Sequence, residues 1–401
     1  MAATFAATPA FEEYRDERAI RRRQALFWSV VALFFVYPFI DEALGLDKVS
    51  ALLSIFIFVI LAMGLNIVTG YAGLLDLGYA AFFAIGAYSQ AFLTSPSSYF
   101  VVHGVVPGFL QHFWPAMAVS WAIAALFGVL LGTPTLRLRG DYLAIVTLGF
   151  GEIVPAFFKN ASGLTRGPNG ISQIDTPTVP LPGLRSIHFN QTDLHNWYWL
   201  ILSVGLVSLF LILRLANSRL GRSWMAVRED EVAAASMGVN LVRTKLWAFG
   251  LGASFAGFAG AVYGGYLQVV FPDQFEFSIS VMVLSMVILG GIGNIYGVII
   301  GGMLLQSFDR IFARELNQPV HWLGSQTGVR FLETHNLTTD RLLIFGTCLV
   351  AMMLFRPGGL FPDKRRSAEM QPETATELEH EDESLYYDTR VMEEPIAGER
   401  A

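Results

Sequence analysis

Residues 50–69 read SALLSIFIFVILAMGLNIVT, a stretch of twenty residues without a charged side chain. A helix of about 20 apolar residues matches the hydrocarbon core of a bilayer, which is about 30 Å thick. Comparable apolar blocks, separated by short polar breaks, recur along the 401-residue chain. Only 15% of the residues are charged and 53% are hydrophobic, whereas an average soluble domain has about 25% charged residues. The sequence therefore predicts an all-α fold, a polytopic bundle of helices that span a lipid bilayer.

Ten spans are predicted from these blocks. The eighth and ninth could be taken for one long helix, but Gly290–Asn294, with the sequence GGIGN, is typical of a turn. The first block follows Arg21–Arg23 and has no small-residue cleavage site after it, so we expect a retained helix and no cleavable signal peptide. The spans are 26–42, 50–69, 73–94, 113–132, 141–158, 197–215, 246–268, 278–292, 295–312 and 341–356.

The distribution of lysine and arginine supports this count and gives an orientation. Basic residues accumulate in cytoplasmic loops of membrane proteins. With ten spans and the N-terminus inside, seventeen basic residues fall inside and eight outside, and the other two lie in the C-terminal tail. We therefore expect both termini to be cytoplasmic, with a charged inside loop at 216–245 and long outside loops at 159–196 and 313–340.

The chain divides into three parts by composition. A short N-terminal tail, 1–24, precedes a transmembrane domain, 25–365, and an acidic tail follows at 366–401. Ser367–Ala401 holds eleven acidic residues and two arginines, which explains why the whole chain has a net charge of −6. This tail has no apolar periodicity and is predicted to be disordered in the cytoplasm. Nothing in the sequence suggests that nucleic acid is a partner.

Polar and small residues inside the apolar blocks are the first functional candidates. Asp76, Glu152 and Asn66 interrupt otherwise apolar segments. A charge at bilayer depth costs at least about 2.5–3.5 kcal/mol, so it normally faces the interior of the bundle or water. Each group could be a structural partner between helices or part of a translocation route. The glycines between Gly70 and Gly86 could serve close helix packing or a broken helix around 69–78 that lines a substrate path.

The inside loop contains a second candidate. Between Gly221 and Gly238 a charged stretch gives way to an alanine-rich helix, and Gly238 is placed to end it. The segment could be a solvated connector. It could also be a docking helix for a cytoplasmic partner, with Trp224 and Met225 as apolar anchors and the charges at 228–231 as a polar rim.

Catalytic signatures are missing from the sequence. There is no Gly-x-x-x-x-Gly-Lys-[Ser/Thr] phosphate loop, because none of the four lysines follows the required glycines. No His, Cys and carboxylate spacing fits a metal, and no nucleophile motif is present. We expect a protein that is not an enzyme and that has no cofactor and no metal site.

Several of these stretches resemble one family, the LivM family of branched-chain amino-acid ABC transporter permeases. The matching stretches are 70–88, 136–153, 165–171, 221–238 and 287–302, in the same order along the chain. In the third stretch, TRGPNGI, Arg166 stands where the family usually has a second glycine, and Asn169 lies within the motif. The resemblance covers about 25–365 and leaves out both tails.

The resemblance implies an ABC importer permease that translocates branched-chain or related amino acids. Its expected partners are a second homologous permease, two cytoplasmic ATP-binding subunits and a periplasmic substrate-binding protein, in a bacterial inner membrane. Val232-Ala233-Ala234-x-x-x-Gly238 is similar to the coupling motif Glu-Ala-Ala-x-x-x-Gly of ABC importers, with Glu231 one residue before the motif's glutamate position. The candidate coupling residues are Arg228, Glu229, Asp230, Glu231, Ala233, Ala234 and Gly238. The candidate translocation residues are Asn66, Asp76, Glu152 and Asn169.

Three alternatives remain at this point. A urea or short-amide ABC permease resembles the same family. An ion-coupled secondary amino-acid transporter would need coupling-ion sites near the middle of the membrane and would not need the charged inside loop. A membrane scaffold or receptor subunit would account only for the long outside loops.

Overall fold

The computed structural model describes residues 33–45, 47–135, 141–179, 187–189, 193–313, 341–356 and 358–361, together with 315, 317, 319, 322 and 326. The predicted N-terminal tail and the acidic tail 366–401 lie outside the described residues, as does most of the predicted outside loop 313–340.

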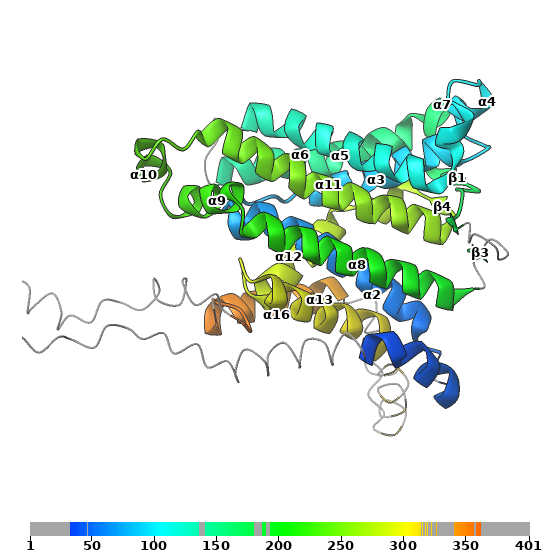
Figure 1. Cartoon of the computed structure of the whole chain (residues 1–401). Helices are drawn as coiled ribbons and strands as arrows, with labels where there is room; N and C mark the ends of the chain where they lie inside the picture. Colours follow the sequence, from blue (N-terminus) through cyan, green and yellow to red (C-terminus); the bar gives the residue numbers. More distant parts are fainter. Residues whose placement is uncertain are drawn as a thin grey trace, which may run out of the picture.

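The described part of the chain is a bundle of long helices (Figure 1). Within the described residues, seven helical segments are long and apolar enough to cross a membrane. Helices α3 and α16 lie within two further predicted spans, and the helical residues 33–44 overlap the first predicted span and extend two residues beyond it. The chain is therefore an all-α polytopic membrane protein, as predicted. The long helices are α2 (Val49–Leu65), α3 (Tyr79–Thr94), α5 (Phe113–Thr135), α6 (Asp141–Asn160), α8 (Leu194–Ala216), α11 (Leu241–Leu267), α12 (Phe277–Gly290), α13 (Ile295–Ser307) and α16 (Arg341–Phe355).

The core forms around α2, α3 and α11. In the helical segment Val49–Tyr71, which begins with α2, 83% of the most apolar stretch is buried inside the protein. The corresponding share is 33% in α5 and in α6. Small residues bring α3 and α11 together, because a Cβ at Gly86 would collide with the backbone of Gly257 and a Cβ at Gly260 with the backbone of Phe83. Close backbone approach of this kind is how helices associate in lipid, where the hydrophobic effect does not drive them together.

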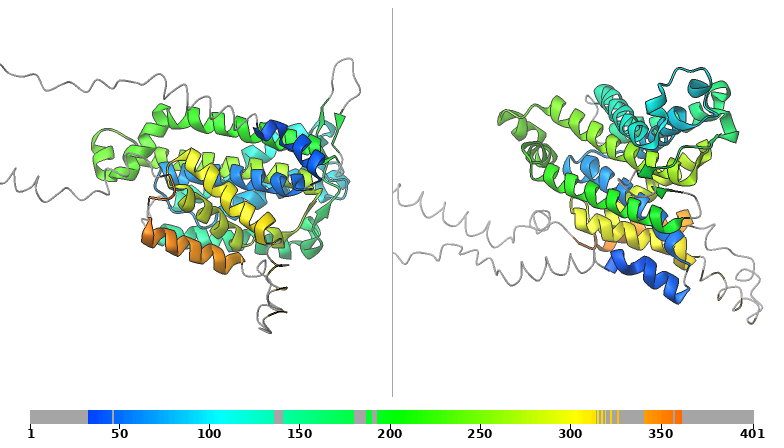
Figure 2. Two further views of the ribbon diagram at one scale, coloured as in Figure 1. Left: turned by 90° about the horizontal axis from the view of Figure 1, so that it is seen from below. Right: turned by 45° about the vertical axis from the view of Figure 1, so that its right-hand side comes forward.

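The two ends of the bundle differ. Helices α9 (Arg219–Glu229) and α10 (Glu231–Ser236) lie at one end of the bundle. Four short strands of the described residues lie at the other end, as all views show (Figures 1 and 2). Strand β1 (Ile171–Ser172) pairs antiparallel with β4 (Val269–Val270), and β2 (Thr178–Val179) pairs with β3 (Ile187–His188). The strand end also carries α4 (Tyr99–Val102), α7 (Ser162–Thr165), η2 (Gly108–Gln111), η3 (Gly167–Asn169) and η4 (Pro272–Phe275). The predicted loop 159–196 thus contains extended pieces and short helices.

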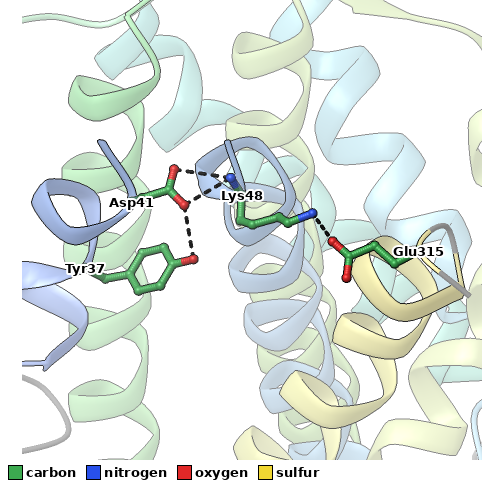
Figure 3. A network of polar contacts seen from close by, with 4 residues as sticks. All are labelled: Tyr37, Asp41, Lys48 and Glu315. Atoms are coloured by element: carbon green, nitrogen blue, oxygen red, sulfur yellow. Dashed lines mark hydrogen bonds and ion pairs between the residues drawn. The ribbon is translucent and has the colours of Figure 1, made fainter. Parts of the chain in front are cut away.

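A polar network joins the first helical residues to α2 and to the segment after α13 (Figure 3). Asp41 is buried and accepts hydrogen bonds from the Lys48 backbone N–H at 3.1 Å and from the Tyr37 hydroxyl at 3.2 Å. The Lys48 ammonium group pairs with Glu315. The network links the turn between residues 33–44 and α2 to Glu315, which follows the π-helix η5 (Phe308–Phe312).

The predicted turn between the eighth and ninth spans is present. Helix α12 ends at Gly290 and α13 begins at Ile295, capped by the Asn294 side chain, which accepts from the N–H groups of Tyr296 and Gly297. Gly291 and Gly293 have φ values of +116° and +91°, a region that favours glycine. The two apolar blocks are therefore two helices and not one.

Candidate functional site

The membrane helix that begins as α2 is interrupted before the chain continues as α3. The α-helix ends at Leu65, Asn66–Tyr71 form the wider π-helix η1, and residues 72–78 are not helical. Gly73, with φ +69°, adopts a conformation that favours glycine. The predicted third span, 73–94, is therefore wrong at its start, because α3 begins only at Tyr79. The broken helix that the glycines allowed is the arrangement found, and we call residues 66–78 the helix break.

Side chains on two neighbouring helices, and one of its own, satisfy backbone groups of the helix break and of the first turn of α3. The Leu77 N–H donates to Thr147 Oγ1 on α6 at 3.0 Å, and the Ala80 N–H donates to Ser280 Oγ on α12 at 2.9 Å. The Gly78 N–H donates to Asp76 Oδ1 at 2.9 Å. Backbone groups at bilayer depth have no water to bond, so each needs a protein partner. The sequence analysis missed Thr147 and Ser280, because a lone hydroxyl in an apolar block usually bonds its own helix, as Thr147 also does.

Three buried polar atoms on the helix break make no hydrogen bond with the described part of the chain. They are Asn66 Nδ2, Thr69 Oγ1 and Asp76 Oδ2. Asn66 and Asp76 have no exposed surface at all. An unpaired buried polar group costs free energy, so such groups are uncommon in native structures. Where they do occur, they indicate a role other than helix packing. Two of the predicted translocation residues, Asn66 and Asp76, thus share one segment with unsatisfied hydrogen-bonding capacity.

A second cluster connects the helix break to helix α9. Arg228 Nη1 donates to the Gly70 carbonyl oxygen at 2.6 Å, and Asn66 Oδ1 accepts from the Gly293 N–H at 3.0 Å. The arginine fits only because its neighbours are glycines: a Cβ at Gly73 would lie 2.8 Å from Arg228 Cγ, and a Cβ at Gly293 would lie 2.8 Å from Arg228 Nη1. We call Asn66, Gly70, Gly73, Arg228 and Gly293 the Arg228 junction.

The positions of Arg228 and Trp224 correct the sequence analysis. Arg228 was predicted at an exposed polar rim, but it is half-buried and points into the bundle. Trp224 was predicted as an apolar anchor for a partner, but it is fully buried, and its Nε1 donates to the Thr244 carbonyl at 2.8 Å. Met225 is half-buried and packs against the core. The periodicity of α9 turns these side chains toward the chain's own helices, which the loop sequence alone does not reveal.

The predicted docking helix is two helices with a sharp joint. Asp230 ends α9 and caps α10, and its Oδ1 accepts from the N–H groups of Val232 at 2.7 Å and Ala233 at 3.0 Å. Gly238, with φ +85°, follows the end of α10, as predicted. An aspartate at an N-cap and a glycine after the C-terminus stabilise a helix too short to persist on its own.

Helix α10 exposes apolar side chains. Val232 is 68% exposed and Met237 is 86% exposed. Ala233 and Glu229 are also exposed, whereas Ala234 is buried. Glu231 pairs with Lys245 Nζ at 2.6 Å, within the chain. The outward surface of α10 therefore consists mainly of small and apolar residues.

The other two predicted translocation residues lie apart from the helix break. Glu152 is exposed on the outer face of α6 and does not face the interior of this chain. Asn169 is exposed in η3 at the strand end of the bundle. The structure thus brings Asn66 and Arg228 together at one junction, places Asp76 further along the same helix break, and leaves Glu152 and Asn169 separate. Among the described residues, no group of three His, Cys, Asp or Glu side chains could hold a metal ion.

Comparison with known proteins adds an independent finding. The family described as "Branched-chain amino acid transport system / permease component" matches residues 49–324. The high-affinity branched-chain amino acid transport system permease protein LivM of Escherichia coli is 37% identical over 360 residues, which cover 86% of this chain and 76% of that protein. LivM of Salmonella typhimurium is 36% identical with the same coverage. The permease protein LivH of E. coli is 24% identical over 62% of this chain and 79% of that protein. No solved structure matches the chain.

Proposed function

The chain belongs to the family of branched-chain amino acid transport permeases, and from that membership we propose that it carries branched-chain or related amino acids inward across a bacterial inner membrane. It is a membrane-spanning permease subunit of an ABC importer. Its proposed partners are a second homologous permease, two cytoplasmic ATP-binding subunits and a periplasmic binding protein. The two relatives named LivM and the one named LivH support a pair of related permeases. ATP hydrolysis is assigned to the separate subunits.

The proposed topology has ten spans with both termini in the cytoplasm. In this orientation α9 and α10 lie at the cytoplasmic end and the short strands at the periplasmic end of the bundle. The parts are a cytoplasmic tail, 1–24, a transmembrane domain, 25–365, and an acidic cytoplasmic tail, 366–401. The placement of all four short strands opposite α9 and α10 supports this assignment, because loops that connect the same ends of successive spans must share one side of the membrane.

The ATP-binding subunits are proposed to dock on α10. Apolar anchors surrounded by polar groups carry most of the free energy of protein interfaces, and Val232 and Met237 are such anchors in place of Trp224. The coupling residues are Arg228, Glu229, Asp230, Glu231, Ala233, Ala234 and Gly238. Of these, Asp230 and Gly238 shape the helix, and Glu231 fixes it to α11 through Lys245.

Motion of the docked subunits is proposed to reach the substrate path through the Arg228 junction. The single observation that carries this mechanism is the hydrogen bond from Arg228 to the Gly70 carbonyl. Arg228 lies on the helix that leads directly into α10, and Gly70 lies in the helix break. ATP binds the closed and open forms of its subunits with different affinity, and only such a difference can shift an equilibrium between two states. Displacement of α9 would therefore pull on the π-helical part of the helix break, next to residues 72–78, which are not helical.

The path itself is proposed to run past the helix break. Asn66 and Asp76 supply unsatisfied hydrogen-bonding groups there, and non-helical backbone at membrane depth is tolerated where it lines a cavity or is buried in protein. Glu152 and Asn169 are proposed to act elsewhere on the route, at the outer face of α6 and at the periplasmic entrance.

The test is purification of the complex and reconstitution in vesicles. The tagged chain should retain a second permease and two ATP-binding subunits, and the vesicles should take up labelled leucine with ATP and the binding protein. Uptake of urea in place of leucine would move the substrate to the short amides. Uptake by the chain alone, driven by an ion gradient, would overturn the importer assignment.

A further inference from the structure

Helix α6 has one face that is covered by its own chain. Thr147, Gly151, Val154 and Phe158 follow each other at helical spacing and are buried. Thr147 bonds the helix break, and the Phe158 ring stacks on Tyr88 of α3 with centroids 3.9 Å apart. This face holds α6 directly beside the helix break.

The opposite face of α6 combines an acidic residue with small and apolar neighbours. Ile145, Gly149, Glu152 and Ala156 lie along one stripe, because residues three and four apart share a helix face. Ile145 is 62% exposed, Glu152 and Ala156 are exposed, and a Cβ at Gly149 would meet nothing within 4 Å. Glu152 makes no ion pair or hydrogen bond within the described residues.

The depth of Glu152 is incompatible with lipid. It is the twelfth residue of the 20-residue helix α6, about 16 Å from the start at 1.5 Å per residue and therefore close to the middle of a hydrocarbon core about 30 Å thick. A carboxylate at that depth faces protein or water. The exposed faces of α5 and α8 differ, since residues such as Leu126, Leu130, Val207 and Leu211 are apolar and suit lipid.

Pairing of α6 with a second copy of this chain is electrostatically unfavourable at Glu152. If two identical chains met symmetrically on α6, the same surface would face itself, and the two Glu152 carboxylates would approach each other at low dielectric. A related chain with a different residue opposite Glu152 avoids this repulsion. Gly149 and Ala156, one turn to either side of Glu152, allow a partner helix to come close enough for a hydrogen bond.

We propose that the α6 stripe of Ile145, Gly149, Glu152 and Ala156 is the surface on which the second permease subunit packs, with a cationic or hydrogen-bond-donating side chain of that subunit opposite Glu152. This inference rests on the proposed importer of two permeases. It places the interface one helix away from the helix break.

Photo-crosslinking in the intact complex tests the surface with Glu152 unchanged. A benzophenone amino acid is introduced at Ile145 on α6, and as matched controls at Val207 or Leu211 on α8; these three side chains are between 50% and 62% exposed. We expect the second permease in the α6 adducts and none of it in the α8 adducts. An intact complex whose second permease crosslinks to α8 and not to α6 would overturn the inference and leave the proposed function standing.

The experiment also distinguishes self-pairing of this chain from the absence of a second permease. If two differently tagged copies of this chain crosslink to each other through α6, the partner is a second copy and the inference is wrong. If no second permease is retained with the wild-type chain, the proposed function fails together with this inference. Retention of the wild-type partner is therefore measured separately from the crosslinking positions.

Substitution of Glu152 gives an independent readout. Glu152→Leu should insert into the membrane at least as well as the wild type, because it removes a charge, yet it should retain at least about tenfold less second permease after washing. Glu152→Gln keeps a hydrogen-bonding group and should retain most of the partner. Full retention of the second permease by Glu152→Leu would contradict the proposal.

Discussion

Truncation of Arg228 to alanine should uncouple ATP hydrolysis from transport without unfolding the permease. The substitution removes the 2.6 Å hydrogen bond to the buried Gly70 carbonyl and the packing of the side chain over Gly73 and Gly293. A hydrogen bond to a charged group is worth about 1.5–3 kcal/mol. If the contact exists in only one of the two transport states, its loss changes the equilibrium between them by about 10- to 150-fold.

The assay is the ATPase activity of the reconstituted complex, with and without the substrate-loaded binding protein. For Arg228→Ala we expect the stimulation by the binding protein to fall at least about fivefold, with uptake reduced in parallel. Arg228→Lys should recover part of the coupling at best, because an ammonium group keeps the charge but lacks the planar fork of donors. Arg222→Ala is the matched control, since Arg222 is exposed on the same helix and, within the described residues, donates to the nearby Asn217 carbonyl and not to the helix break.

Two results would refute this reasoning. Wild-type stimulation and uptake in Arg228→Ala would mean that the Arg228 junction does not transmit motion. Equal loss in Arg222→Ala and Arg228→Ala would mean that the effect comes from the positive charge of α9 on a docking surface, and not from the contact with Gly70.

Three further predictions follow from single contacts. Gly238→Val forces a β-branched residue into φ +85° at a cost of about 1–2 kcal/mol, and it should lower ATPase stimulation by loosening the end of α10. Thr147→Val leaves the Leu77 N–H without its 3.0 Å partner and should lower leucine uptake and cost about 1–3 kcal/mol of stability. Gly86→Ala puts a methyl group against the Gly257 backbone and should cost about 1–3 kcal/mol by overpacking, measured as a lower thermal midpoint in detergent.

Conservative or neutral substitutions serve as controls for these three. Gly238→Asn should keep most of the coupling, because asparagine tolerates the left-handed region. Thr147→Ser keeps the hydroxyl and should behave like the wild type. Gly346→Ala on α16 adds a methyl group where nothing lies within 4 Å, so its thermal midpoint should not fall. A midpoint equal to the wild type in Gly86→Ala would show that α3 and α11 can separate without cost.

The membrane helices were predictable because lipid imposes a simple rule on every segment. An uninterrupted run such as 50–69 has to be a helix, since only a helix satisfies its own backbone in the absence of water. The limit of the rule is visible at 73–78, which is apolar enough to read as the start of a span but is not helical. There the Leu77 N–H is satisfied by Thr147, and just beyond it the Ala80 N–H is satisfied by Ser280; both partners are distant in the sequence.

The residues of the charged loop were harder to assign, because composition does not show whether a side chain points into the bundle or outward. Trp224 and Arg228 lie in a charged loop, and both appeared suited to a partner's surface, yet both turn inward. Val232 and Met237 face outward instead. Their exposure depends on how α9 packs against η1 and α11, which is a property of the assembled bundle.

The sequence by itself determined the class of protein, the positions of most spans, the turn at Gly290–Asn294 and the end of α10 at Gly238, because these depend on local hydrophobicity and on the conformational freedom of glycine. Only the tertiary structure decided that Asn66 and Arg228, 162 positions apart in the sequence, belong to one junction, and that Asp76 is buried while Glu152 faces outward. A charged residue in an apolar block has the same local sequence signal on either face of its helix. Which face is covered depends on the packing of the neighbouring helices.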